Sequence, residues 1–269
     1  MRRGAARTLR AMPTLLRVGV AETVAYRAEF LVWILTTTQP LIMLGLWTFV
    51  AGFGTFGGYS ANDFTAYFLA DLIVRQLTGN WVAWQLMEDI RLGTMSMRLL
   101  RPIHPFFAYA SSHVAAIPFR AVVMLPIAFI LLVSSGASSL TTDPAQIIAF
   151  VPSLLLAWLI TFCVMFALGS LAFFITQTSA LADVYFGLFQ IFSGYIMPLE
   201  IMPRPIQVIA SWLPFKYTLA VPIQLLTKSL SPHDIAVLLA QQAAWTAIML
   251  AVAMSVWRLG IKRYEAVGN

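Results

Sequence analysis

The sequence reads FLVWILTTTQPLIMLGLWTFVA over residues 30–51, a stretch without one charged side chain. A helix of roughly 20 predominantly apolar residues crosses a hydrocarbon core about 30 Å thick. Apolar stretches of comparable length recur along the rest of the chain. Water-soluble folds rarely contain even one such stretch, so we expect an integral membrane protein composed of α-helices.

The composition of the whole chain agrees with this expectation. Hydrophobic residues make up 60% and charged residues 10% of the 269 residues, and the mean hydropathy is +0.82. Soluble domains carry about 25% charged residues. Because the chain is too short for a set of spans and a soluble catalytic domain together, we expect a single transmembrane domain over residues 1–269.

The apolar stretches predict six transmembrane helices. Their bounds are residues 30–51, 64–86, 106–133, 145–175, 181–197 and 235–257. Residues 1–29 combine apolar residues at helical spacing with several arginines, which predicts an N-terminal helix lying in the membrane interface. A simple basic tail is the alternative. Two long connections remain, a polar connector over residues 87–105 and a proline-rich outer segment over residues 198–232.

Lysine and arginine side chains are distributed unevenly between the two sides of the predicted membrane. Twelve lie before the first span, in the connector or after the last span, whereas the opposite loops contain only Arg204, Lys216 and Lys228. Because positively charged loops stay in the cytoplasm, we expect both termini to be cytoplasmic, in a bacterial inner membrane. Anionic lipid headgroups then account for the net charge of +6 without nucleic acid as a partner.

The chain contains no sequence motif for nucleotide binding, metal binding or catalysis. The patterns G-x-x-x-x-G-K-[ST], H-E-x-x-H and G-x-S-x-G are all absent. The single cysteine, Cys163, and the three histidines are scattered, whereas metal sites need clustered ligands. We therefore expect a chain without a catalytic residue, a metal or a cofactor of its own.

Charged side chains fall deep within two predicted spans, where a charge costs at least about 2.5–3.5 kcal/mol. Asp71 and Arg75 are four residues apart, so they share a helical face and can form an ion pair. The pair is either static or lines a pathway or a helix interface that rearranges. Arg120 has no obvious partner nearby in sequence, and Gln190 is expected to form hydrogen bonds between helices.

The connector MEDIRLGTMSMRLLRPIHP, residues 87–105, alternates charged and apolar side chains. This pattern predicts a short amphipathic cytoplasmic helix, with Gly93 as a weak point and the step from Arg101 to Pro102 as its end. The helix is either a lone interfacial element or a docking surface for a cytoplasmic partner.

The outer segment begins with YIMPLEIMPRP, residues 195–205, and continues with two apolar pieces that end near Leu213 and Leu226. Each piece has roughly 8–13 residues, which is too short to cross a bilayer. We expect two short re-entrant helices that dip into the outer leaflet. Irregular backbone at that depth must be covered by protein or face a water-filled cavity.

The order of these parts resembles an ABC transporter permease of the type-2 exporter class. The resemblance covers nearly the whole chain and includes LLRP at residues 99–102, GYIMP at residues 194–198 and WLPFKY at residues 212–217. The LLRP element resembles a subgroup in which two different permeases are encoded together with one ATPase.

The resemblance implies an ATP-driven exporter whose cytoplasmic ABC ATPase dimer binds the ATP and Mg. A second permease would complete the translocation pathway within the membrane lipids. The implied coupling helix contains Glu88, Asp89, Ile90, Arg91, Leu92, Met95, Arg98 and Leu99. The implied pathway or helix-interface residues are Asp71, Arg75, Arg120 and Gln190, and the implied outer gate contains Pro198, Glu200, Pro203 and Pro214. The turn at residues 176–180 carries no charged side chain. The resemblance therefore does not extend to a second coupling contact at this turn.

Two alternatives belong to other functional classes. A secondary transporter or channel would work without an ATPase, but no internal repeat or ring of charges is evident. A membrane-embedded enzyme acting on lipids would need a cluster of acid–base or metal-binding residues. Co-purification with an ATPase separates both alternatives from the permease. The few charges in the spans favour an amphipathic or lipid-like cargo over an ion.

Overall fold

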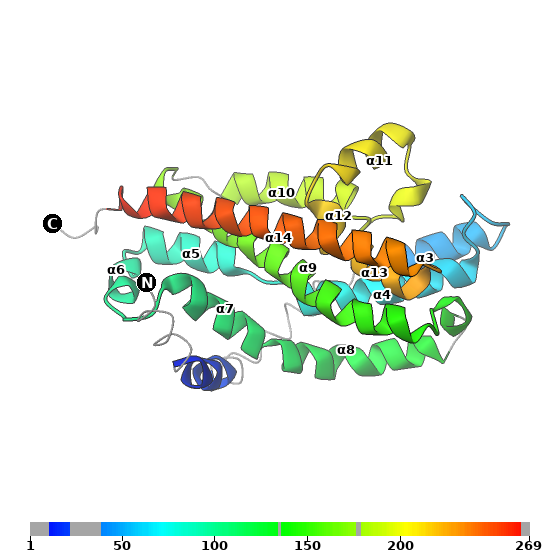
Figure 1. Cartoon of the computed structure of the whole chain (residues 1–269), viewed down its shortest axis with the longest axis horizontal. Helices are drawn as coiled ribbons and strands as arrows, with labels where there is room; N and C mark the ends of the chain where they lie inside the picture. Colours follow the sequence, from blue (N-terminus) through cyan, green and yellow to red (C-terminus); the bar gives the residue numbers. More distant parts are fainter. Residues whose placement is uncertain (1–10, 22–38, 134–135, 176–178, 265–269) are drawn as a thin grey trace.

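The computed structural model describes residues 11–21, 39–133, 136–175 and 179–264. Over these residues the chain forms α-helices, short 3-10 helices and turns, without a β-strand, which confirms the predicted all-α class. Most of the long helices run along one common axis (Figure 1). Helices suit a membrane because each satisfies its own backbone hydrogen bonds.

Within the described residues, three helical segments are long and apolar enough to cross a membrane. They correspond to the third, fourth and sixth predicted spans. The first, Pro105–Pro126, contains α7 (Pro105–Ala115) and the first part of α8 (Ile117–Leu132), and the second combines α9 (Pro144–Ser170) with η2 (Leu171–Phe173). The third is α14 (Pro232–Ile261), which packs along α9 (Figure 1).

The other predicted spans appear as shorter helices. Within the first span the structure describes α3 (Gln39–Ala51), while residues 30–38 lie outside the described part, and α10 (Ser179–Phe192) covers much of the fifth span. The second span is divided into α4 (Ala61–Thr78) and α5 (Val82–Arg91). The six-span layout therefore remains a prediction, with three spans supported by helices of sufficient length.

The described part of the N-terminal region is the helix Ala11–Ala21, which packs against α7. A Cβ added at Gly19 would lie 2.9 Å from the Cβ of Ala115 and 3.0 Å from the Cα of Ser112. The absence of a side chain at Gly19 thus permits the close approach. The rest of residues 1–29 lies outside the described part, and the interfacial position of this helix remains a prediction.

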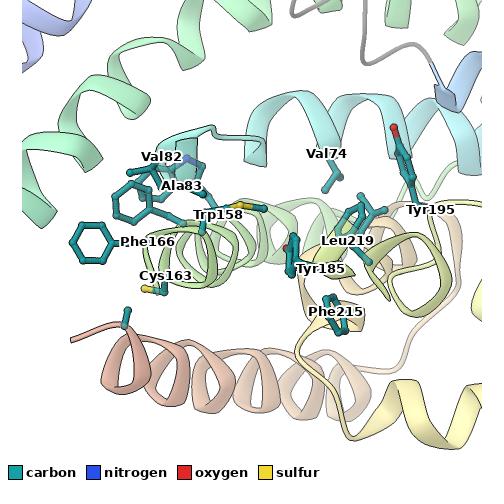
Figure 2. Close-up of a cluster of buried hydrophobic side chains, with 14 of the residues drawn as sticks. Val74, Val82, Ala83, Trp158, Cys163, Phe166, Tyr185, Tyr195, Phe215 and Leu219 are labelled. Carbon is teal, nitrogen blue, oxygen red and sulfur yellow. The ribbon is translucent and has the colours of Figure 1, made fainter. Parts of the chain in front are cut away.

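An aromatic core joins α7, α9 and α14. The ring centroids of Phe106 and Phe166 are 5.1 Å apart, and those of Phe166 and Trp257 are 5.2 Å apart. Figure 2 shows Phe166 of α9 close to Val82 and Ala83 of α5. Cys163 is buried in the same cluster, as expected for a cysteine that packs as a small apolar side chain.

The connector forms two helical pieces, so the single amphipathic helix that was predicted is interrupted at its predicted weak point, Gly93. α5 ends at Arg91, and α6 (Met95–Leu99) begins after a turn. Gly93 in that turn has a φ of +74°, a conformation that glycine adopts without steric cost. The turn reverses the chain, so the connector does not form one straight helix. We call the resulting helix–turn–helix unit, residues 88–100, the connector tip.

The outer segment contains η3 (Leu199–Ile201), α11 (Arg204–Ser211), α12 (Phe215–Thr218) and α13 (Ala220–Thr227). The two predicted apolar pieces correspond to α11 and to the adjoining α12 and α13. In Figure 1, α6 lies near one end of the bundle, whereas α11 and α13 lie toward the other end. The connector and the outer segment therefore occupy opposite parts of the molecule, as the predicted topology requires.

Candidate functional site

Asp89 is the centre of the connector turn. Its carboxylate forms an ion pair with Arg98, with 2.7 Å between Oδ2 and Nε. The hydroxyl of Thr94 donates to Oδ1 over 2.6 Å, and the hydroxyl of Tyr109 donates to Oδ2. One carboxylate thus links α5, the turn, α6 and α7.

Further contacts hold the turn against the body of the bundle. The hydroxyl of Tyr264 donates to the carbonyl of Gly93 over 3.0 Å, and the guanidinium of Arg98 lies 4.8 Å from the ring centroid of Tyr109. Ile90 and Met95 are buried in the core. The chain end, α7 and the core therefore fix the position of the tip.

The outer side of the tip carries large apolar side chains without cover. Leu92 is 61% exposed, Met97 66% and Leu100 80%. Glu88 and Arg91 are also exposed, whereas Asp89, Arg98 and Leu99 are partly buried. The predicted coupling residues thus separate into an exposed set that can contact a partner and a buried set that positions the turn.

Asp71 and Arg75 do not form the expected ion pair. Arg98 and Asp89 make the only ion pair within the described residues, and neither carboxylate oxygen of fully buried Asp71 has a hydrogen-bond partner there. The guanidinium of Arg75 instead lies 5.2 Å from the ring centroid of Phe189 and 5.9 Å from that of Tyr195. Packing of α4 against aromatic rings thus prevails over the i, i+4 geometry.

Arg120 of α8 stabilises the break between α4 and α5. Its Nη1 donates to the carbonyl of Gln76 over 3.3 Å and to the carbonyl of Gly79. Its guanidinium lies 4.8 Å from the ring centroid of Trp81. The last carbonyls of a helix carry partial negative charge and lack intrahelical partners, so a buried cation is well placed there.

Two further polar contacts join distant helices inside the bundle. The amide of Gln39 donates to Gln190 Oε1 over 3.2 Å, which confirms the expected hydrogen bond between helices at Gln190. His113 Nε2 lies 3.1 Å from Gln85 Oε1. Both side-chain atoms of buried Asn80 lack a partner among the described residues.

Glu200 joins three parts of the outer end. Its carboxylate accepts from the hydroxyl of Tyr59 over 3.2 Å and from the amide of Gln224 over 2.8 Å. Gln207 donates to the Glu200 carbonyl over 3.0 Å. Burial and the nearby Glu200 charge raise the pKa of Tyr59. The prolines named for the outer gate, Pro198, Pro203 and Pro214, directly precede η3, α11 and α12.

A polar cavity of 190 Å³ lies beside this junction. It is lined by Gly58, Tyr59, Asp63, Ser139, Thr227 and Lys228. The ammonium of Lys228 lies 4.0 Å from the ring centroid of Tyr59. Burial alone would raise the pKa of Asp63, but hydrogen bonds with Ser60 and Ser139 and the charge of Lys228 lower it below its usual range.

The family model described as "ABC-2 family transporter protein" matches residues 35–268. This chain belongs to the ABC-2 transporter family. Membership makes it the multi-pass permease component of an ABC transporter, a transport component that associates with an ABC ATPase. No curated protein and no solved structure matches the chain. The match spans every described helix from α3 to α14, so it includes the connector tip, the broken α4–α5 span and the outer segment.

Several residues that organise these sites were not predicted from the sequence of this ABC-2 family member. Tyr109 and Tyr264 hold the connector turn, and Asn80 lies at the break of the second span. The adjacent Gly79 and Asn80 are typical of turns and were a signal for the break. The two tyrosines carried no local signal because their partners are 20 and 171 positions away.

Proposed function

We propose that this chain is a permease subunit of an ATP-driven exporter and forms the translocation pathway with a second, different permease. A cytoplasmic ATPase dimer that binds ATP and Mg drives it, and the permease performs no covalent chemistry. The resemblance of residues 99–102 to the two-permease subgroup supports the heteromeric arrangement. The distribution of basic residues supports a bacterial inner membrane with both termini in the cytoplasm.

The connector tip is the observation that carries this proposal. Leu92 and Leu100 are exposed just beyond the ends of α5 and α6, and Met97 is exposed on α6 itself. A cluster of uncovered apolar side chains on a fixed turn is typical of a protein-binding surface. Glu88 and Arg91 add charges beside it. We assign this tip to the contact with the ATPase.

The bonding of the tip explains how a partner would move the spans. Asp89 connects α5 to α6 and to α7 through Arg98 and Tyr109. Displacement of the tip is therefore transmitted to two membrane-embedded helices together. Packed helix interfaces switch between discrete arrangements instead of deforming continuously, so ATP-driven closure of the ATPase can change access to the pathway.

The outer gate follows from the same logic. Glu200 connects η3 to the loop before α4 through Tyr59 and to α13 through Gln224. A rearrangement of α4 and α5 would move Tyr59 and strain the hydrogen bonds of Glu200. We propose that the outer segment closes the pathway in this state and opens when the Glu200 contacts break.

Co-purification tests the proposal. Leu92→Glu and Met97→Glu place charges on the tip and are expected to abolish recovery of the ATPase with the tagged permease. Phe53→Glu is the matched control, because Phe53 is 83% exposed in the loop between α3 and α4, at the other end of the bundle. Retention of the ATPase by both tip variants would contradict the proposal. Transport by the chain alone in liposomes would instead support a secondary transporter or channel.

A further inference from the structure

Two arginine side chains converge at the break between α4 and α5. A Cβ added at Gly79 would lie 3.2 Å from Nη1 of Arg75 and 3.8 Å from Nη1 of Arg120. Arg120 is only 4% exposed. Neither guanidinium belongs to the ion pair found among the described residues, so two like charges meet inside the bundle without an acidic partner in contact.

The contacts already present satisfy only part of this charge. Arg120 Nη1 is used by the carbonyls of Gln76 and Gly79, and aromatic rings cover one side of each guanidinium. Arg75 Nε, Arg120 Nη2 and Asn80 Nδ2 are buried donors without a partner among the described residues. Unpaired buried donors next to positive charge are costly and are suited to an acceptor that carries negative charge.

Asp71 does not supply that acceptor. It lies one helical turn before Arg75, yet both of its carboxylate oxygens lack a hydrogen-bond partner within the described residues. The unused donors are therefore available to a ligand. Arg75 is only partly buried, so a ligand can reach the part of its side chain that the rings of Phe189 and Tyr195 do not cover.

We propose that Arg75, Arg120 and Asn80 bind the anionic headgroup, a phosphate or a carboxylate, of an amphipathic molecule. Planar guanidinium groups match the oxygen atoms of both anions. The aromatic rings of Phe189 and Tyr195 and the apolar spans around them suit the attached hydrocarbon. This inference rests on the proposed function in treating that molecule as the cargo. The inference goes beyond the proposed function by naming the charge of the cargo and the place where the cargo binds.

A binding titration with the full-length chain in a non-ionic detergent tests the site. Dodecyl phosphate is the probe, dodecyltrimethylammonium tests the sign of the charge, and inorganic phosphate tests the need for a hydrocarbon chain. Tryptophan fluorescence reports binding, because Trp81 contacts the Arg120 guanidinium. We expect dodecyl phosphate to bind at least about ten-fold more tightly than either other probe, as charge-assisted hydrogen bonds predict.

Arg75→Gln is the main variant, because Arg120 also caps α4 and its loss can prevent folding. We expect Arg75→Gln to weaken dodecyl phosphate binding about ten-fold to 100-fold and Arg75→Lys to weaken it less. Arg204→Gln, at an exposed position in the outer segment, is the matched control and should bind as the unmodified chain does. A single symmetric peak in gel filtration verifies that Arg75→Gln is folded.

Unchanged affinity in folded Arg75→Gln, or equally tight binding of dodecyltrimethylammonium, would overturn the site. Equally tight binding of inorganic phosphate would overturn its assignment to an amphipathic molecule. Recovery of the ATPase is measured on the same variant. If Arg75→Gln keeps the ATPase while anion binding proves absent from the unmodified chain, the inference fails and the proposed function stands.

Discussion

Arg98 Nε lies 2.7 Å from Asp89 Oδ2 and closes the turn between α5 and α6. The two side chains are nine positions apart, and the left-handed conformation of Gly93 makes their approach possible. Because Tyr109 of α7 shares the same carboxylate, the pair links the exposed tip to a membrane-embedded helix. This link leads to the first prediction.

Asp89→Ala is expected to lower the free energy of unfolding more than Arg98→Ala. Asp89→Ala removes the acceptor for three donors, of which Tyr109 is buried in the bundle, and should cost about 1–3 kcal/mol. Arg98→Ala removes one partner of a pair whose arginine side chain is 37% exposed, so about 1 kcal/mol or less is expected. Equilibrium unfolding in mixed detergent micelles measures both values. Equal losses would show that Thr94 and Tyr109 contribute nothing through Asp89.

Gly93→Ala is expected to destabilise the turn and weaken coupling to the ATPase. An L-residue at a φ of +74° costs roughly 1–2 kcal/mol. The strain falls on the tip itself, so ATP hydrolysis by the complex should become less dependent on cargo. Gly45→Ala is the matched control, because an added Cβ there meets no atom within 4 Å. Unchanged coupling in Gly93→Ala would argue against a rigid tip.

His104 makes the start of α7 sensitive to acid. Its Nδ1 accepts from the backbone N–H of Phe106 over 3.2 Å, and this bond requires an unprotonated nitrogen. Burial, with a smaller effect of the Arg258 charge, lowers the pKa of His104 in the folded state. A lowered pKa means that the unfolded chain takes up the proton first as the pH falls. The stabilisation is therefore complete above about pH 6.5 and is lost as the pH falls toward the folded-state pKa.

His104→Asn should remove this pH dependence. Asparagine retains an oxygen acceptor suited to the N-cap and does not titrate. Thermal denaturation of both proteins between pH 4.5 and 8, values that bracket the reference pKa of about 6.5, measures the effect. We expect the unmodified chain to lose stability relative to His104→Asn below about pH 6.5. Parallel curves for the two proteins would show that the cap does not control acid stability.

Asp71→Asn is expected to raise the free energy of unfolding. The fully buried carboxylate has no hydrogen-bond partner among the described residues, and a buried polar group left unsatisfied costs about 1–3 kcal/mol, more if it is charged. Asparagine has nearly the same shape and carries no charge. Gln190→Ala is a useful comparison, because it breaks the contact with Gln39 and should lower stability. A loss of stability in Asp71→Asn would reveal that the carboxylate has a partner.

Glu200→Gln is expected to loosen the outer junction without affecting the connector. The amide keeps one acceptor oxygen but weakens the hydrogen bonds from Tyr59 and Gln224, which a carboxylate accepts more strongly. Hydrogen–deuterium exchange should increase in α11 and in the loop before α4, while exchange in α5 and α6 stays the same. An equal increase in exchange at both ends, or no increase at either end, would contradict the assignment of Glu200 to an outer gate.

Local sequence patterns were sufficient for much of the fold. The apolar stretches predicted the long helices α9 and α14, because the energetic demand of a bilayer applies to each span separately. Ser60 and Asp63 define the start of α4 through a reciprocal pair of hydrogen bonds only three residues apart. Gly93 was recognised as a weak point because glycine favours turns, although the complete break of the helix was not predicted.

The sequence by itself determined the membrane environment, the helical class and the order of the parts, since these depend on composition and on contacts within a few residues. Only the tertiary structure decided the partners of the charged side chains. Arg120 caps a helix through a carbonyl 41 positions away, and Arg75 faces Phe189 and Tyr195 instead of its neighbour Asp71. The physical reason is that i, i+4 spacing makes a contact possible, whereas the faces of the packed helices determine which possible contact forms.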